Sequence, residues 1–145
     1  MQKRSFSPRL AQLLLTLGTA EFFGPIIRDR DVTHLLNPSW PGHARFHLMW
    51  LLCFMALSGV VNLVLIWRGR PTRARLLIVW AWQACNVFAF WGAAALVSSY
   101  DGLLVDPSFH LKILGMNENV FGFIVFSALL VACLLAVTRM ERSGE

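Results

Sequence analysis

Charged residues are scarce in this chain. They make up 14% of its 145 residues, against about 25% in a typical water-soluble protein. Hydrophobic residues make up 57%, and the mean hydropathy is +0.58. A soluble domain of this size has too little interior to bury so much apolar surface. The scarcity of charge therefore argues against an ordinary soluble domain and indicates a protein whose surface faces lipid.

Cysteine is also rare, and no cofactor-binding motif stands out. Cys53, Cys85 and Cys133 each stand inside an apolar run, and no two of them form a Cys-x-x-Cys pair. Cysteines in such positions act as small hydrophobic residues and say nothing about the redox compartment. The sequence therefore requires no cofactor. Its histidines leave open a bound transition metal.

Basic residues outnumber acidic ones and give a formal net charge of +5. They stand between the apolar runs instead of sharing one amphipathic face. Charges in this pattern orient membrane spans, whereas a nucleic-acid-binding protein gathers them into a patch or stripe. We therefore expect the lipid bilayer as a partner and no nucleic acid.

Four apolar runs divide the sequence, at about residues 10–27, 46–67, 76–98 and 120–138. Each approaches the ~20 residues that a helix needs to cross a hydrocarbon core of ~30 Å. Backbone amides in hydrocarbon must be paired within the protein, so continuous runs of this length form helices. The sequence thus predicts an all-α fold, in which residues 1–145 form a single integral membrane four-helix bundle. No small-residue cleavage site follows the first run, so we expect it to be kept as a span.

The distribution of Lys and Arg predicts the orientation of these spans. One side holds Lys3, Arg4, Arg9, Arg68, Arg70, Arg73, Arg75, Arg139 and Arg142, and the other holds Arg28, Arg30, Arg45 and Lys112. Basic residues gather in cytoplasmic loops. We therefore expect a multi-pass protein of the cell membrane with both termini in the cytoplasm.

The connection over residues 29–47 carries three of the four histidines. His43 and His47 are four positions apart, which places both rings on one face of a helix. That spacing suits a pair of metal ligands, an acid–base or substrate-binding role, or an interfacial belt of polar tips. A zinc site usually needs three or four ligands, and only His43 and His47 have a suitable spacing here. The metal site is therefore short of ligands. Further candidates for substrate binding in this connection and the turn after it are His34, Asn37, Trp40, Arg45 and Trp50.

The stretch Asn37-Pro38-x-Trp40-Pro41-x-His43-Ala44-Arg45-Phe46-His47 resembles one found in small bacterial four-helix membrane proteins. The general layout of the chain is similar to that of the DoxX-type group. This resemblance implies the four-helix architecture. It brings no catalytic residue with it.

Polar side chains occur inside three of the four predicted spans. Glu21 lies near the middle of the first, where an acidic residue costs ~2.5–3.5 kcal/mol, so it should face the bundle interior. Ser58 lies on the second span, and Gln83 and Asn86 lie on the third. Together they predict a polar-lined pocket that opens outward. The connection over residues 99–119, which includes His110, is expected either to cover this pocket as a lid or to be a solvated loop.

These features favour a membrane-embedded enzyme that acts on a lipophilic small molecule such as an isoprenoid, a sterol-like compound or a quinone. Glu21 would be the catalytic acid, and His43 and His47 would accept protons, as isomerase or cyclase chemistry requires. One alternative is a non-catalytic membrane subunit or small transporter component, whose small residues pack against a partner or a second copy. The other is a metal-binding membrane protein, with His43 and His47 as ligands.

Overall fold

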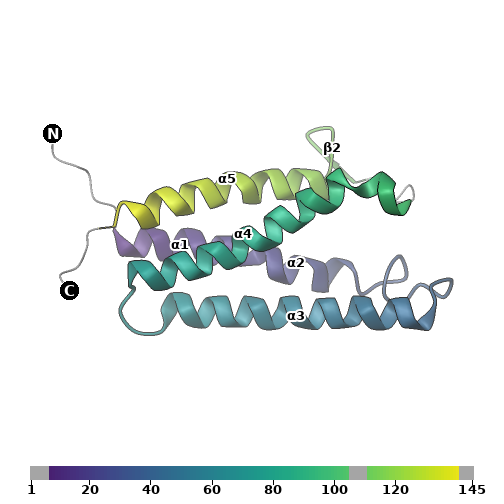
Figure 1. Ribbon diagram of the computed structural model, residues 1–145, viewed down its shortest axis with the longest axis horizontal. Coiled ribbons are helices and arrows are strands. Elements are labelled where there is room, and N and C mark those ends of the chain that lie inside the picture. Colours follow the sequence, from purple (N-terminus) through teal and green to yellow (C-terminus); the bar gives the residue numbers. More distant parts are fainter. Residues whose placement is uncertain (1–6, 105–110, 141–145) are drawn as a thin grey trace.

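The computed structural model describes residues 7–104 and 111–140, and most of these residues are helical (Figure 1). In chain order the elements are α1 (Pro8–Gly18), α2 (Ala20–Arg28), α3 (Gly42–Trp67), α4 (Arg73–Ala95), the 3-10 helix η1 (Val97–Tyr100), β1 (Lys112–Ile113), β2 (Met116–Asn117) and α5 (Glu118–Thr138).

Within the described residues, four helical segments are long and apolar enough to cross a membrane. They are Pro8–Arg28, Gly42–Trp67, Arg73–Ala95 and Glu118–Thr138. This confirms the four predicted helical segments. The second helix begins at Gly42, four residues before its apolar run, directly after Pro41, whose backbone has φ −55° and ψ 141°. Its 26 residues correspond to ~39 Å of helix, more than a hydrocarbon core of ~30 Å requires.

A short β-hairpin departs from the predicted all-α fold. β1 and β2 pair as antiparallel strands, with Lys112 opposite Asn117 and Ile113 opposite Met116. The two turn residues, Leu114 and Gly115, have φ values of 51° and 80°. Positive φ at both positions suits a two-residue hairpin turn, and glycine adopts it without strain. The hairpin leads directly into α5.

The first apolar segment is interrupted at Thr19, between α1 and α2. The Thr19 hydroxyl donates to the carbonyl of Leu15, as does its backbone N–H. Such back-bonding by threonine competes with the regular helical pattern and often bends a helix. Its consequence is that Glu21 lies in the first turn of α2 rather than in the middle of one continuous helix.

The helices are closely packed at one end of the molecule, which we call the turn end because the α3–α4 connection lies there (Figure 1). The buried core at this end consists of Ala11, Leu15, Ile66, Leu76, Val79, Cys133, Ala136, Val137 and Met140. A smaller buried cluster of Ala84, Val87 and Leu130 lies between α4 and α5, on the side of this core that faces the other end of the molecule. We call the opposite end, with the β-hairpin, the hairpin end.

Two helix pairs extend from this core toward the hairpin end. α2 packs on α3, and α4 packs on α5. In Figure 1, α4 slants away from α3 along its length and reaches α5 near the hairpin. The backbones of the α2–α3 pair and the α4–α5 pair therefore diverge toward the hairpin end.

Labelling from outside intact cells tests the orientation predicted from the basic residues. A tag after Glu145 should give no signal, because the positive-inside rule places the turn end in the cytoplasm. A tag inserted between Leu114 and Gly115, in the hairpin turn, should be labelled fully. Labelling of the Glu145 tag with a protected hairpin tag would reverse the topology.

Candidate functional site

A cavity of ≈ 620 Å³ lies between the two helix pairs. Its lining comes from all four apolar segments and from the hairpin. The residues are Ala20, Glu21, Gly24, Pro25, Arg28, Asp29, His34, Leu51, Leu52, Met55, Asn86, Ala89, Phe90, Ile113, Glu118, Asn119, Phe121, Gly122, Phe123 and Phe126. This volume is in the range of ligand pockets, which usually measure ~300–1,000 Å³. We call it the main cavity.

Glu21 and Asn86 bring polar groups to this mostly apolar space. Glu21 is only 3% exposed, and its carboxyl group interacts with the Asn86 side chain. Even so, neither Glu21 Oε1 nor Asn86 Nδ2 has a hydrogen-bond partner of good geometry among the described residues. A buried polar group without a partner costs about 1–3 kcal/mol. Such a pair is therefore suited to receive a polar group from a bound molecule.

Aromatic rings form one wall of the main cavity. Phe90 of α4 and Phe123 of α5 are stacked, with ring centroids 3.7 Å apart and an angle of 1° between the planes. Phe126 meets Phe123 edge to face at 6.1 Å. Leu52 and Met55 of α3 contribute apolar side chains to the lining. This lining suits the apolar body of a lipophilic molecule.

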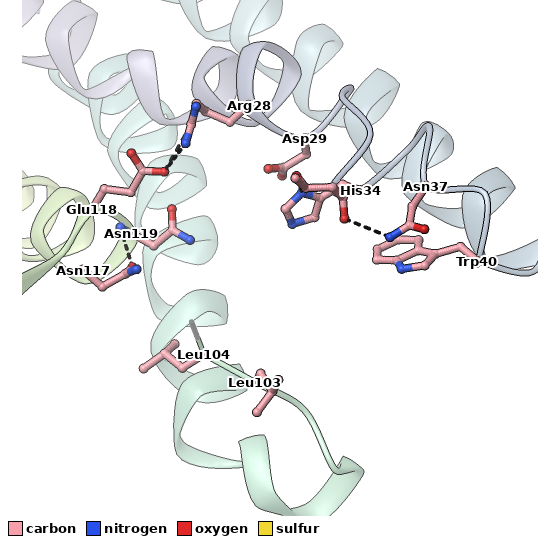
Figure 2. A pocket seen from close by; sticks show the side chains of 11 residues that line it. Arg28, Asp29, His34, Asn37, Trp40, Leu103, Leu104, Asn117, Glu118 and Asn119 are labelled. Atoms are coloured by element: carbon pink, nitrogen blue, oxygen red, sulfur yellow. Dashed lines mark hydrogen bonds and ion pairs between the residues drawn. The ribbon is translucent and has the colours of Figure 1, made fainter. Parts of the chain in front are cut away.

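A second, smaller cavity of ≈ 370 Å³ lies at the hairpin end (Figure 2). We call it the mouth. It shares Arg28, Asp29, His34, Glu118 and Asn119 with the main cavity. Its other lining residues are Thr33, Asn37, Trp40, Leu103, Leu104 and Asn117. The two spaces thus have a common polar wall and differ in character, the mouth being the more polar.

An ion pair connects the two helix pairs at this common wall. Arg28 Nη2, at the end of α2, lies 2.5 Å from Glu118 Oε1, in the first turn of α5 (Figure 2). The Arg28 Nε–H donates to the same oxygen at 3.2 Å. Because Arg28 is about half exposed, the pair adds little stability, about 0–1 kcal/mol. It joins the end of α2 to the first turn of α5.

Two aspartates beside this ion pair differ in their surroundings. Burial raises the pKa of Asp29 above its ordinary value, and the nearby charges of His34 and Arg28 oppose that rise. The Thr33 hydroxyl and backbone N–H both donate to Asp31 Oδ1 and lower the pKa of that carboxyl. Asp29 therefore stands in a drier site than Asp31.

The structure brings several predicted site residues together. Glu21 and Asn86 line the main cavity, His34 lines both spaces, and Asn37 and Trp40 line the mouth. Asn37 is positioned by its own turn, since Asn37 Oδ1 accepts from the backbone N–H and the hydroxyl of Ser39. Their part in catalysis or binding stays a prediction.

His43 and His47 lie elsewhere. Both are exposed on α3 and line neither cavity. Their Nε2 atoms are 3.0 Å apart, so the two rings do share a face, as the spacing predicted. The described residues contain no group of three or more His, Cys, Asp or Glu side chains placed to hold a metal ion. The metal site and the proton-accepting role of these histidines stay predictions, and His110 lies outside the described residues.

The remaining predicted site residues do not line either cavity. Gln83 is fully buried, and its Nε2 donates to the Leu15 carbonyl at 2.8 Å and to the Thr19 hydroxyl at 3.1 Å. Ser58 is buried on α3. Arg45 and Trp50 lie on the part of α3 that carries the histidine pair. Gln83 thus makes an interhelical contact, and the binding roles predicted for these four residues stay untested.

The sequence suggested Phe90 as one of several possible wall residues, but it did not predict the Arg28–Glu118 ion pair or the stacking of Phe90 on Phe123. The signal available for Arg28 and Glu118 was their opposite charge at the ends of two predicted spans that were expected to meet on the same side. The arrangement as a whole can hold an apolar body in the main cavity, a polar atom at Glu21 and Asn86, and a polar head group in the mouth.

The DoxX-type resemblance stays a prediction. The chain matches no family model, and no curated protein or solved structure is significantly similar to it.

Proposed function

We propose that this protein is a membrane-embedded enzyme that binds a lipophilic small molecule in the main cavity and donates a proton to it from Glu21. The substrate class is an isoprenoid, a sterol-like compound or a quinone, and the reaction is an isomerisation or cyclisation. We also propose that the protein lies in the cell membrane with both termini in the cytoplasm, so that the mouth opens outward.

One observation supports the proposal above all others. The side chain of Glu21 is almost completely buried, lines a largely apolar cavity, and keeps one oxygen without a hydrogen-bond partner among the described residues. Intramembrane ionisable residues are rare and usually mark a functional site. An apolar surrounding keeps a carboxylic acid in its neutral form, in which it can donate a proton.

The proposed chemistry needs only one acid. The O–H bond of Glu21 breaks and its proton bonds to one carbon of a substrate double bond, which leaves a carbocation on the neighbouring carbon. Loss of a proton from an adjacent carbon to the Glu21 carboxylate then forms the new double bond and restores the acid. A cation beside the faces of Phe90, Phe123 or Phe126 is stabilised by the ring electrons, by about 0.5–2 kcal/mol for each contact.

Filling the main cavity tests whether it holds a molecule. Gly122 lines the cavity, and a Cβ atom added there meets no heavy atom within 4 Å. Gly122→Leu should therefore insert an apolar side chain without a clash and displace the bound molecule. Lipophilic molecules extracted from purified protein and identified by mass spectrometry should include one that the wild type retains and Gly122→Leu lacks.

Gly92→Leu is the matched control. Gly92 is also helical, also has nothing within 4 Å of an added Cβ, and does not line either cavity. Its extract should equal that of the wild type. Identical extracts from all three proteins would overturn the proposal.

A non-catalytic membrane subunit or transporter component is the second proposal. It is favoured by the position of His43 and His47, which lie outside both cavities and so do not supply a second acid–base group there. Such a protein would bind the same molecule and release it unchanged.

A further inference from the structure

We infer that the mouth selects a ligand whose head group donates hydrogen bonds or carries a positive charge, and that it disfavours an anionic head group. The ligand class is then a long-chain alcohol or amine rather than a carboxylic acid or phosphate ester. This inference rests on the proposed binding of a lipophilic molecule in the main cavity.

The charges that line the mouth are the first argument. Its carboxyl groups belong to Asp29 and Glu118, and its guanidinium group belongs to Arg28 (Figure 2). The guanidinium of Arg28 is bound to Glu118 through both Nε and Nη2. Apart from His34, the charged groups among the described lining residues are therefore two carboxylates and one guanidinium, and Asp29 is the carboxylate outside the ion pair. A like charge on a ligand would meet repulsion in this partly dry space.

Several neutral polar groups of the mouth hydrogen-bond within its own loops. Asn37 Oδ1 accepts from Ser39, and Asn117 Oδ1 accepts from the backbone N–H of Asn119. Thr33 donates its hydroxyl hydrogen to Asp31. These contacts stabilise turns and the start of α5, and none of them is made to Asp29.

The energetics of Asp29 point the same way. Burial raises the pKa of this carboxyl, which means that its charged form loses hydration in the folded protein. A ligand hydroxyl or ammonium group that donates to Asp29 would replace the lost water. An anionic head group would instead place a further negative charge beside it.

The position of Asp29 relative to Glu21 sets the orientation of the ligand. Both residues border the main cavity, and they are eight positions apart on or next to α2, which corresponds to ~12 Å along a helix. A chain molecule can thus place its head at Asp29, its body along the aromatic wall, and its reacting part at Glu21.

Three probes of equal chain length test this inference: dodecylamine, dodecanol and dodecanoate. The protein is reconstituted in nanodiscs of phosphatidylcholine, and the apparent Kd of each probe is obtained from the rise in melting temperature with probe concentration. Gly122→Leu protein provides the correction for probe that only partitions into lipid. We expect the amine and the alcohol to bind at least ten-fold more tightly than dodecanoate.

The variant Asp29→Asn removes the negative charge and should reduce the preference for amine over dodecanoate at least five-fold. Asp101→Asn is the control, because Asp101 is exposed and lines neither cavity, and it should keep the wild-type preference. Equal or tighter binding of dodecanoate to the wild type would overturn the inference. So would a preference that is unchanged in Asp29→Asn.

These outcomes separate the inference from the proposed function. If all three probes bind alike and Gly122→Leu abolishes the binding, the main cavity is a ligand site and only the head-group selectivity is wrong. If no probe raises the melting temperature of the wild type above that of Gly122→Leu, both the selectivity and the proposed binding are overturned.

Discussion

Replacement of Glu21 by glutamine is expected to lower the turnover rate by about 10²–10⁴-fold, the usual contribution of general acid catalysis. Glutamine has nearly the shape of a protonated glutamic acid and keeps hydrogen-bonding capacity, but it lacks the acidic proton. Binding of the substrate should change little, so the loss should appear in kcat rather than in KM. The measurement is conversion of the molecule extracted from wild-type protein, followed by mass spectrometry.

Glu21→Leu separates catalysis from packing. It removes both the proton and the polar contact with Asn86, so it should lose activity and bind substrates that carry an oxygen at the buried end more weakly. A Glu21→Gln protein with wild-type turnover would rule out the acid role and leave a binding protein or subunit as the better account.

The second large effect is expected at the contact between α2 and α3. A Cβ atom added at Gly59 would lie 2.5 Å from Cζ of the Phe23 ring, closer than real Cβ contacts allow. Gly59→Leu must therefore displace the Phe23 ring or push α2 away from α3, and overpacking of this kind costs about 1–3 kcal/mol. The free energy of unfolding, measured by denaturation in detergent micelles, should fall by this amount.

A double variant identifies the cause of that loss. Phe23→Ala opens the space that a side chain at position 59 needs, so Phe23→Ala combined with Gly59→Leu should be more stable than the sum of the single effects predicts. Gly92→Leu is the control, with nothing within 4 Å of the added Cβ and an expected change within about 0.5 kcal/mol. Strict additivity of Phe23→Ala and Gly59→Leu would show that the two helices are not packed as described.

The sequence was sufficient to predict the four apolar helices, because the thickness of a bilayer fixes the length of a span. It also predicted that Glu21 and Asn86 point toward a common interior, since polar groups avoid lipid. Both side chains line the main cavity. The length of an apolar run and the polar residues within it are local properties. They can therefore be read from a single sequence.

The face of α3 that turns inward was harder to predict. The helix is apolar on all sides, so its pattern does not distinguish a lipid-facing side from a packed one. The spacing of His43 and His47 placed them on a common face, as observed, but left open whether this face forms an exposed interfacial belt or lines the pocket. Their prediction as pocket residues depended on a rotation of the helix that only tertiary packing determines.

Contacts between distant segments were also beyond the sequence. Arg28 and Glu118 are 90 positions apart, and their pairing depends on how α2 and α5 are placed at the hairpin end. The close approach of Gly59 to Phe23 depends in the same way on the packing of α2 against α3. Contacts between such distant residues depend on how whole helices pack, and the local sequence around each residue does not determine that packing.

The central claim is that the main cavity, between the two helix pairs, holds a lipophilic molecule. Photolabelling tests this claim most directly. The probe is a long-chain alcohol that carries a diazirine on its chain, and the labelled residues are identified by peptide mass spectrometry of protein in nanodiscs. We predict saturable labelling at Phe90 and Phe123, which unlabelled alcohol competes away and Gly122→Leu prevents. Labelling at the exposed rings of Phe54 and Phe88 should rise linearly with probe concentration. Linear labelling at all four phenylalanines, insensitive to competitor, would contradict the account.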